Sequence, residues 1–237
     1  MDNSIALVTG ANTGIGKEIA RQLVAAGLTV YAASRDAGRG ESAVRELGRG
    51  TRPLLLDVTD AGSIAAAASQ VPALDILVNN AGISLDDKAP DKESIDSFRW
   101  VYETNVFGVV EVTNAFLPAL RRSEHPRIVN ISSSTGSLTL SAERAAAGRA
   151  GGGFAAYRSS KAALNALTIF YAHALAADGF KVNALAPGLR RTGLNAVAAA
   201  SGGDPAEAAA GAVYLALLPD DGPTGQFLSW DGTPVPW

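Results

Sequence analysis

The stretch Ile5-Ala6-Leu7-Val8-Thr9-Gly10-Ala11-Asn12-Thr13-Gly14-Ile15-Gly16 decides the fold. Its first five residues are mostly apolar and partly β-branched, which predicts a short buried strand. The glycines predict a sharp turn, and the segment from Lys17 to Ala26 predicts a helix that ends at Gly27. A strand, a glycine turn and a helix in this order can bind a pyrophosphate through backbone amides and the positive end of the helix dipole. An ordinary tight turn is the alternative, because the spacing is G-x-x-x-G-x-G and not the commoner G-x-G-x-x-G.

The same alternation of strand and helix continues along the chain. Further strand patterns cover Leu28 to Ser34, Pro53 to Leu56, Ile76 to Val78, Arg127 to Ile131, Phe180 to Ala186 and Gln226 to Trp230. Strands separated by helical segments form parallel βαβ units. The sequence therefore predicts one α/β domain over residues 1–237, a doubly wound, Rossmann-like parallel sheet with helices on both faces.

Composition narrows the chemistry. A net charge of -3 gives no electrostatic reason to expect nucleic acid or a membrane surface as a partner, so a small molecule is expected. With no cysteine and two scattered histidines, neither a disulfide nor a metal site is expected, and redox chemistry would need an organic cofactor. The chain starts without a signal-peptide pattern and has no apolar run of about 18 residues, so a cytoplasmic location is expected.

The residues that follow each predicted strand form the expected ligand side of the sheet. Ser34 and Arg35 end the second strand, where an acidic residue would bind a free ribose hydroxyl and an arginine suits a 2′-phosphate. Arg35 thus favours NADP(H) over NAD(H), with a solvated surface charge as the alternative. Asp36 is assigned to the start of the next helix, where an acidic side chain is favoured.

Other strand ends add polar groups and glycines to the same edge. They are Asp57 and Val58, then Asn79 to Gly82, then Ser132 to Gly136, then Pro187 and Gly188. Simple turn chemistry is the alternative for Asp57 and for Asn79 to Gly82, and an ordinary loop is the alternative for the serines. A long helical stretch from Ile95 to about Arg122 carries Asn105.

Tyr157 and Lys161 open another predicted helix, one turn apart on the same face. We expect the lysine charge to lower the phenol pKa from about 10, so that Tyr157 can exchange protons near neutral pH. Alone, this spacing also occurs by chance on solvated helices.

Together, Thr9 to Gly16, Asn79-Asn80-Ala81-Gly82, Asn105, Ser133, Tyr157-x-x-x-Lys161 and Pro187-Gly188 resemble the short-chain dehydrogenase/reductase family. Ser137-Leu-Thr-Leu140, Lys161 to Thr168, Leu217 to Gly225 and the ending Val-Pro-Trp237 look most like its carbonyl-reductase-like subgroup.

The resemblance implies a catalytic tetrad of Asn105, Ser133, Tyr157 and Lys161, with Ser132 as the alternative serine. Tyr157 would protonate the carbonyl oxygen, Lys161 would lower its pKa and hold the nicotinamide ribose, Ser133 would bond the developing alkoxide, and Asn105 would position a water. The expected cofactor-binding residues are Gly10, Asn12, Thr13, Gly14, Ile15, Gly16, Ser34, Arg35, Asp57, Val58, Asn79, Ala81, Gly82, Tyr157, Lys161, Pro187, Gly188 and Thr192.

Two segments depart from the family pattern. Ser141 to Gly153 is rich in Ala and Gly, lengthens the interval before Tyr157 and is expected to form a flexible flap, which leaves monomer, dimer and tetramer open. Leu194 to Gly203 is expected to be a small-residue loop, followed by a helix that Asp204, Pro205 and Glu207 mark with a capping box. The predicted function is NADPH-dependent reduction of a ketone or aldehyde to an alcohol. The alternatives are an NAD-dependent alcohol dehydrogenase and a non-catalytic dinucleotide-binding regulator.

Overall fold

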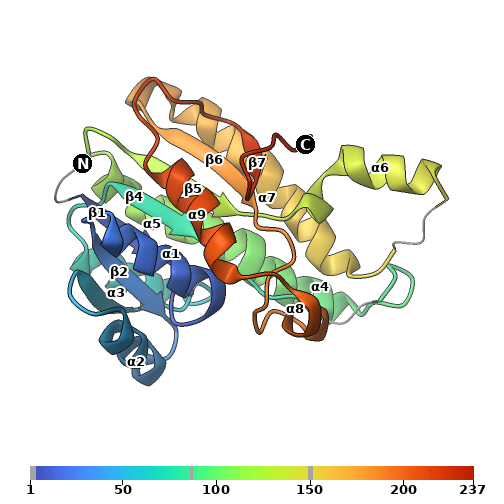
Figure 1. The fold of residues 1–237 in the computed structure, drawn as a ribbon, viewed down its shortest axis with the longest axis horizontal. Helices are drawn as coiled ribbons and strands as arrows, with labels where there is room; N and C mark the ends of the chain where they lie inside the picture. The colour runs from blue at the N-terminus through green and yellow to red at the C-terminus, as the bar shows by residue number, and fades with distance from the viewer. Residues whose placement is uncertain (1–3, 86–87, 149–151) are drawn as a thin grey trace.

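The computed structural model describes residues 4–85, 88–148 and 152–237. Seven parallel strands form one sheet in the order β3-β2-β1-β4-β5-β6-β7 (Figure 1). The strands are β1 (Ile5–Val8), β2 (Thr29–Ser34), β3 (Thr51–Leu55), β4 (Ile76–Asn79), β5 (Arg127–Ile131), β6 (Lys181–Ala186) and β7 (Phe227–Ser229). The chain order reverses between β1 and β4, so the predicted doubly wound sheet is confirmed.

Helices cover both faces of the sheet. Side chains of α1 (Gly14–Ala25), α2 (Ala37–Leu47) and α9 (Pro205–Ala216) pack on one face. Those of α3 (Ala61–Gln70), α5 (Gly108–Leu120) and α7 (Ala155–Ala174) pack on the other. The remaining elements are α4 (Ile95–Tyr102), a π-helical turn η1 (Glu103–Phe107), α6 (Leu138–Ala146), α8 (Ala196–Ser201) and the short 3-10 turns η2 (Ser134–Gly136) and η3 (Ala176–Asp178).

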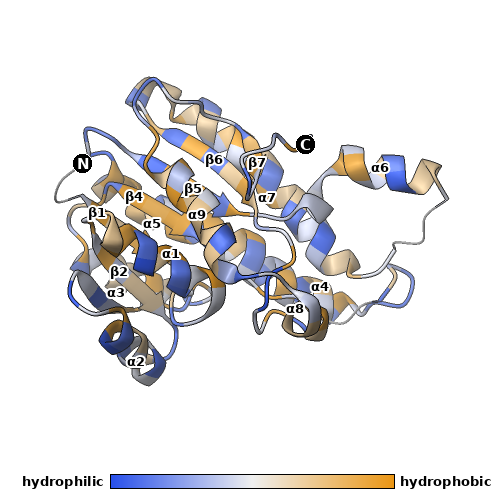
Figure 2. Cartoon of the chain, in the orientation of Figure 1, coloured by the Kyte–Doolittle hydropathy of each residue, from blue (hydrophilic) through white to orange (hydrophobic). Residues whose placement is uncertain are grey.

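The strands alternate between two cores. In β1, Ala6 and Val8 belong to the core under α1 and α9, whereas Leu7 belongs to the core under α5. β4 repeats the pattern, with Leu77 facing the α5 side. Successive side chains of a strand point to opposite faces, and both faces of the central strands are covered, so most residues of these strands are apolar (Figure 2).

Two segments that the sequence gives no regular structure each contain a short helix. Part of the segment expected as a flexible flap is helical: α6 begins after Ser137, whose hydroxyl accepts from the Leu140 amide, and its alanines, glutamate and arginine are good helix formers. Residues 149–151 of that segment lie outside the described residues. The loop expected before Gly203 contains α8, because Asn195 caps it by accepting from the Ala198 amide at 2.8 Å.

The helix α9 begins where the sequence predicts, at Pro205 after the cap residue Asp204. The capping box is only half formed, however. Asp204 accepts from the Ala206 amide, but the Glu207 carboxylate pairs with Arg190 instead of returning to the cap. Glu207 therefore pairs with Arg190, 17 residues away in the sequence, and not with the backbone of its own helix cap.

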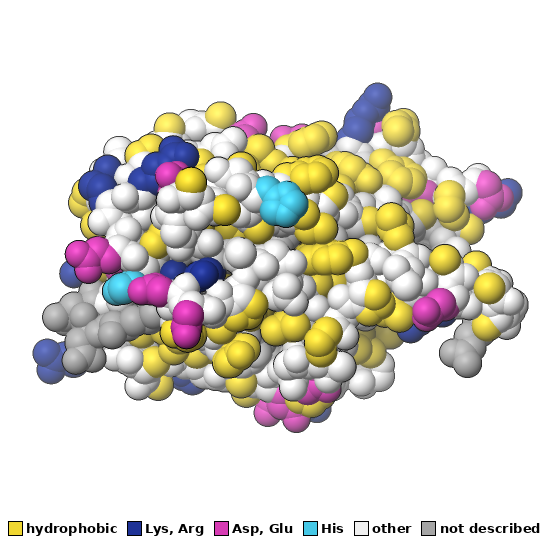
Figure 3. All heavy atoms as spheres, turned by 90° about the horizontal axis from the view of Figure 1, so that it is seen from above, with side chains coloured by type: hydrophobic (Ala, Val, Ile, Leu, Met, Phe, Trp, Pro, Cys, Tyr) yellow, Lys and Arg dark blue, Asp and Glu magenta, His cyan; other side chains and the backbone are white. Residues whose placement is uncertain are grey.

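Apolar side chains remain exposed on the helices that lie outermost. Trp100 of α4, Phe107 of η1 and Phe170 of α7 are each more than half exposed. The face seen from above likewise shows hydrophobic side chains between charged groups near its ends (Figure 3). One chain alone thus leaves apolar surface uncovered. Among the described residues, no helix is long and apolar enough to cross a bilayer.

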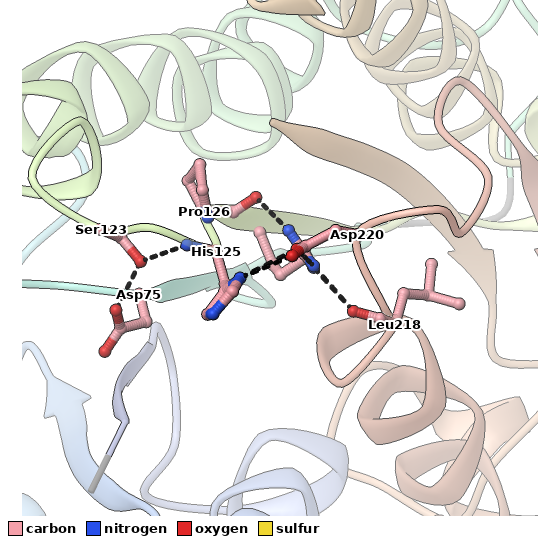
Figure 4. A network of polar contacts seen from close by, with 7 residues as sticks. Asp75, Ser123, His125, Pro126, Leu218 and Asp220 are labelled. Carbon is pink, nitrogen blue, oxygen red and sulfur yellow. Dashed lines mark hydrogen bonds and ion pairs between the residues drawn. The ribbon is translucent and has the colours of Figure 1, made fainter. Parts of the chain in front are cut away.

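A polar network holds the end of the sheet that lies opposite the strand carboxyl ends (Figure 4). Arg127, fully buried at the start of β5, donates to the Leu218 carbonyl and to the Asp220 carboxylate, which His125 also contacts. These bonds hold the pKa of Asp220 below its usual value, the Arg127 bond contributing most. The network links β5 to the turn after α9. It lies at the opposite end of the sheet from the strand carboxyl ends, where the candidate site forms.

Candidate active site

The glycine turn after β1 has a shape that only glycine allows. Gly10 and Gly14 have φ angles of 63° and 57°, in the left-handed region. At Gly16 a Cβ would lie 2.3 Å from the Asn80 amide nitrogen and 2.5 Å from the Gly10 carbonyl oxygen. Thr13 is the cap residue of α1, but its side chain accepts no hydrogen bond from the first amides of the helix. These amides can therefore donate to another group. This arrangement is suited to a phosphate group.

A cavity of about 400 Å³ runs along the strand carboxyl ends, from Arg35 after β2 to Tyr157 and Lys161 on α7. Most of the predicted cofactor residues line it: Gly10, Asn12, Thr13, Gly14, Ile15, Gly16, Ser34, Arg35, Asp57, Val58, Ala81, Gly82, Tyr157, Lys161, Pro187 and Thr192. The elongated shape and this lining fit a dinucleotide.

Two predicted cofactor residues lie elsewhere. Asn79 is buried behind the cavity, where its amide donates to Thr113 and to Asn130, because the last residue of β4 points into the sheet's core. Asn80 lines the cavity in its place. Gly188 lines a second, neighbouring cavity.

Sequence reasoning missed several lining residues. These are Arg39, Leu56, Thr59, Ile83, Thr104, Ile131, Gly193 and Leu194. Arg39 carried a usable signal, since it is a cation in the first turn of the helix that follows Arg35. The Asp36 carboxylate accepts from the Arg39 amide at 2.8 Å and caps α2, which confirms the helix-start role expected for Asp36. Two guanidinium groups therefore line the end of the cavity near β2.

Tyr157 and Lys161 lie one turn apart near the start of α7, as predicted. The Lys161 ammonium is 5.7 Å from the centre of the Tyr157 ring and donates to the Ile131 carbonyl at 2.8 Å. Gly136 permits this placement, because a Cβ there would lie 2.7 Å from the Lys161 backbone carbon. The end of β5 and the turn η2 thus fix the lysine in the cavity.

The expected lowering of the Tyr157 pKa is wrong for this structure. Burial raises the pKa of Tyr157 to about 12, and a hydrogen bond with the Ser133 hydroxyl offsets the rise only in part. Burial likewise lowers the pKa of Lys161 to about 8. Loss of hydration, which sequence spacing does not reveal, outweighs the attraction between the two groups. Tyr157 is therefore a protonated phenol at neutral pH.

The two candidate serines have different surroundings. Ser133 shares a hydrogen bond with Tyr157 and another, at 2.8 Å, with the Thr135 hydroxyl. The Ser132 hydroxyl is buried and donates to the Asn165 side chain on α7. Only Ser133 thus has its hydroxyl beside the phenol.

Asn105 is fully buried in the π-helical turn η1. Its side-chain oxygen accepts from the Ile83 amide, and its nitrogen donates to the Ile83 carbonyl and the Ser160 hydroxyl, each at 2.9 to 3.0 Å. The side chain therefore links the loop after β4 to α7. Water positioning by Asn105 stays a prediction.

The second cavity, of about 260 Å³, adjoins the first and shares five residues with it, namely Ile15, Tyr157, Pro187, Thr192 and Leu194. Ser133 lines it beside Tyr157, and Phe154, Leu189 and Val197 make it largely apolar. The helix α8 supplies one wall through Val197 and Ala198. An apolar substrate with a polar group directed at Tyr157 and Ser133 fits this arrangement.

Comparison with known proteins agrees with the geometry. The family model described as short chain dehydrogenase matches residues 4–201. The chain is 37% identical to (-)-isopiperitenone reductase of Mentha piperita, over 95% of this chain and 96% of that protein. It is 34% identical to salutaridine reductase of Papaver bracteatum, over 94% and 93% of the two chains. The solved structure of NADPH-bound carbonyl reductase from chicken fatty liver superposes with a TM-score of 0.84 at 29% identity, over 100% of both chains.

Proposed function

Since this chain belongs to the short-chain dehydrogenase family, and is thereby an oxidoreductase, we propose that it reduces a ketone or aldehyde to an alcohol with NADPH. One observation carries the proposal: the cavity lined by the glycine turn and the largely apolar second cavity meet at Tyr157. A group at this junction can act on a substrate in one cavity and a cofactor in the other. We also propose that residues 1–237 form one domain that serves both purposes.

The residues of the long cavity fit a dinucleotide, because the glycine turn has no room for side chains and offers free helix amides. When bound, a reduced nicotinamide supplies the hydride for the carbonyl carbon. The chain's own groups supply the proton and the positioning.

Tyr157 donates its phenolic proton to the carbonyl oxygen as that oxygen gains charge. The phenol is protonated at neutral pH, as a proton donor must be. The Ser133 hydroxyl, already bonded to the phenol, stabilises the developing alkoxide by a hydrogen bond. Lys161, anchored on the Ile131 carbonyl, places a cation beside the ring and supports the phenolate that remains.

The preference for NADPH rests on the two arginines near the end of β2. A guanidinium binds a phosphate by paired charge-assisted hydrogen bonds, and Arg35 and Arg39 both line that part of the cavity. The Asp36 carboxylate, which would repel a phosphate, is engaged as the cap of α2. That the chicken carbonyl reductase was solved with NADPH is consistent with this choice.

Turnover of a panel of simple aryl and alkyl ketones, followed by nicotinamide absorbance with NADPH and with NADH, tests the proposal. We expect reduction with NADPH to exceed reduction with NADH. Faster oxidation of the matching alcohols with NAD at neutral pH would instead support an alcohol dehydrogenase. Binding of NADPH without any turnover would support a regulator.

A further inference from the structure

Thr135 lies two residues after Ser133, in the short turn η2 beside the second cavity. Its hydroxyl is 2.8 Å from the Ser133 hydroxyl, and its backbone amide donates to the same Ser133 oxygen at 3.2 Å. Thr135 also lines the second cavity together with Ser133 and Tyr157. One residue therefore makes two contacts with the hydroxyl that is expected to bind the developing alkoxide.

The turn η2 fixes Thr135 in this position. Ser133 caps the turn by accepting from the Thr135 amide, and the Gly136 amide donates to the Ser133 carbonyl at 2.9 Å. Gly136 in turn lies directly against α7, because a Cβ there would be 2.7 Å from the Lys161 backbone carbon. The Thr135 hydroxyl is thus held next to Ser133 by the backbone and by α7.

The hydrogen-bonding capacity of Ser133 shows what the Thr135 hydroxyl can do. A serine hydroxyl has one proton to donate and two lone pairs that accept. The Thr135 amide can only donate, so it occupies one lone pair of the Ser133 oxygen. If the Thr135 hydroxyl donates to the other lone pair, Ser133 keeps its proton as its one remaining hydrogen-bonding group.

The direction of these hydrogen bonds matters for Tyr157, whose phenol shares a hydrogen bond with Ser133. If Ser133 accepted the phenolic proton, that proton would point away from a substrate carbonyl. When Thr135 occupies both lone pairs, Ser133 can only donate, either to the phenol oxygen or to a substrate oxygen. The Tyr157 proton is then free for the carbonyl.

We propose that Thr135 is a positioning residue of the reduction, because its hydroxyl donates to Ser133 and thereby directs the protons of Ser133 and Tyr157 at the substrate oxygen. This inference rests on the proposed function. Thr135 transfers no proton itself. Its hydrogen bond also polarises the Ser133 hydroxyl, since hydrogen bonds in a chain strengthen one another.

Thr135→Val tests this role, because it removes the hydroxyl, keeps a side chain of nearly the same shape and retains the backbone amide. We expect kcat/KM for ketone reduction to fall about three- to tenfold, the scale of one hydrogen bond. Thr135→Ser keeps a hydroxyl and should restore most of the wild-type value. Thr139→Val makes the same substitution at an exposed residue of α6 that lines neither cavity, and should leave kcat/KM unchanged. Unchanged turnover by Thr135→Val overturns the proposal.

A double-mutant cycle separates this role from a direct contact between Thr135 and the substrate. If Thr135 acts through Ser133, Thr135→Val should have almost no further effect on kcat/KM in a Ser133→Ala protein, because the hydroxyl that it directs is already absent. If Thr135→Val costs the same factor in both backgrounds, Thr135 acts independently of Ser133 and the positioning role is rejected.

Neutron diffraction from deuterium-exchanged crystals of the wild type with NADPH tests the inference without turnover. We expect the Thr135 deuteron to point at the Ser133 oxygen; a Ser133 deuteron that points at Thr135 overturns the proposal. If ketones are reduced but the variants behave alike, only this inference fails. If no ketone is reduced, the proposed function fails, and the deuteron positions still decide the direction of the hydrogen bond.

Discussion

The hydroxyl of Thr9 accepts hydrogen bonds from the backbone amides of Asn80 and Ala81, each at 2.9 Å, and the Asn80 side chain donates back to the Thr9 carbonyl at 2.8 Å. Thr9 follows β1 and Asn80 follows β4, the two strands between which the chain order reverses. The pair therefore fixes the glycine turn against the neighbouring loop, in the crevice where this fold binds ligands.

Thr9→Val should destabilise the protein by about 1–3 kcal/mol, because an isosteric side chain leaves two amide donors without their acceptor. Urea unfolding measures the loss. Thr9→Val should also weaken NADPH binding, because Gly10, the first glycine of the turn expected to bind the cofactor, is the next residue in the chain. Thr139→Val is the control, because that hydroxyl is exposed and bonds the Trp237 carbonyl. Equal effects of the two substitutions would contradict a special role for Thr9.

Tyr157→Phe should lower carbonyl reduction by about a hundredfold or more, the scale of a lost general acid, while the fold and NADPH binding persist. Steady-state kinetics measure the rate of carbonyl reduction, and cofactor titration measures NADPH binding. The matched control is Tyr171→Phe, which removes a phenol from the same helix where it bonds Asn114 and lines neither cavity. Near-normal turnover by the Tyr157 variant would reject the mechanism.

Arg35→Ala should lower kcat/KM with NADPH by about tenfold or more relative to NADH, because the loss of a charge-assisted phosphate contact costs a few kcal/mol at most. The ratio of kcat/KM for the two cofactors is the measurement. Arg49→Ala removes an exposed charge that lies outside the cavity and should leave the ratio unchanged. A wild type that prefers NADH would remove the basis for this assignment.

Lys161 should make stability depend on pH. Its folded-state pKa of about 8 lies below its usual value of 10.5, so between these pH values the unfolded chain binds more protons. Wild type should therefore gain stability relative to Lys161→Met as pH rises from 7.5 to 9.5, by roughly 1–2 kcal/mol. Urea midpoints of both proteins at the two pH values measure the difference. A constant difference would show that the folded-state pKa is not lowered.

Ala142→Pro should have little effect on global stability, below about 1 kcal/mol, although proline disrupts a helix interior. The reason is that no residue of α6 is buried, and the helix lies apart from the sheet at one end of the molecule (Figure 1). Ala212→Pro makes the same change in α9, where the alanine is fully buried, and should cost several kcal/mol. If the α6 variant has an altered substrate range or subunit association, this segment has the role expected for a flap.

The sequence by itself determined the features that short-range rules control. The alternation of apolar residues identified the strands, glycine identified the turn after β1, and a spacing of four placed Tyr157 and Lys161 on one helix face. Asp36 was correctly assigned as a helix cap for the same reason, since its partner, the Arg39 amide, lies only three residues away.

Only the tertiary structure decided which way the side chains turn and how much water they keep. It directed Asn79 into the core and left Asn80 in the cavity, and it paired Glu207 with Arg190 instead of its own helix cap. It also raised the Tyr157 pKa where spacing alone suggested a decrease. Each outcome depends on groups contributed by distant segments, because hydration and hydrogen-bond partners are set by everything that packs around a side chain and not by its neighbours along the chain.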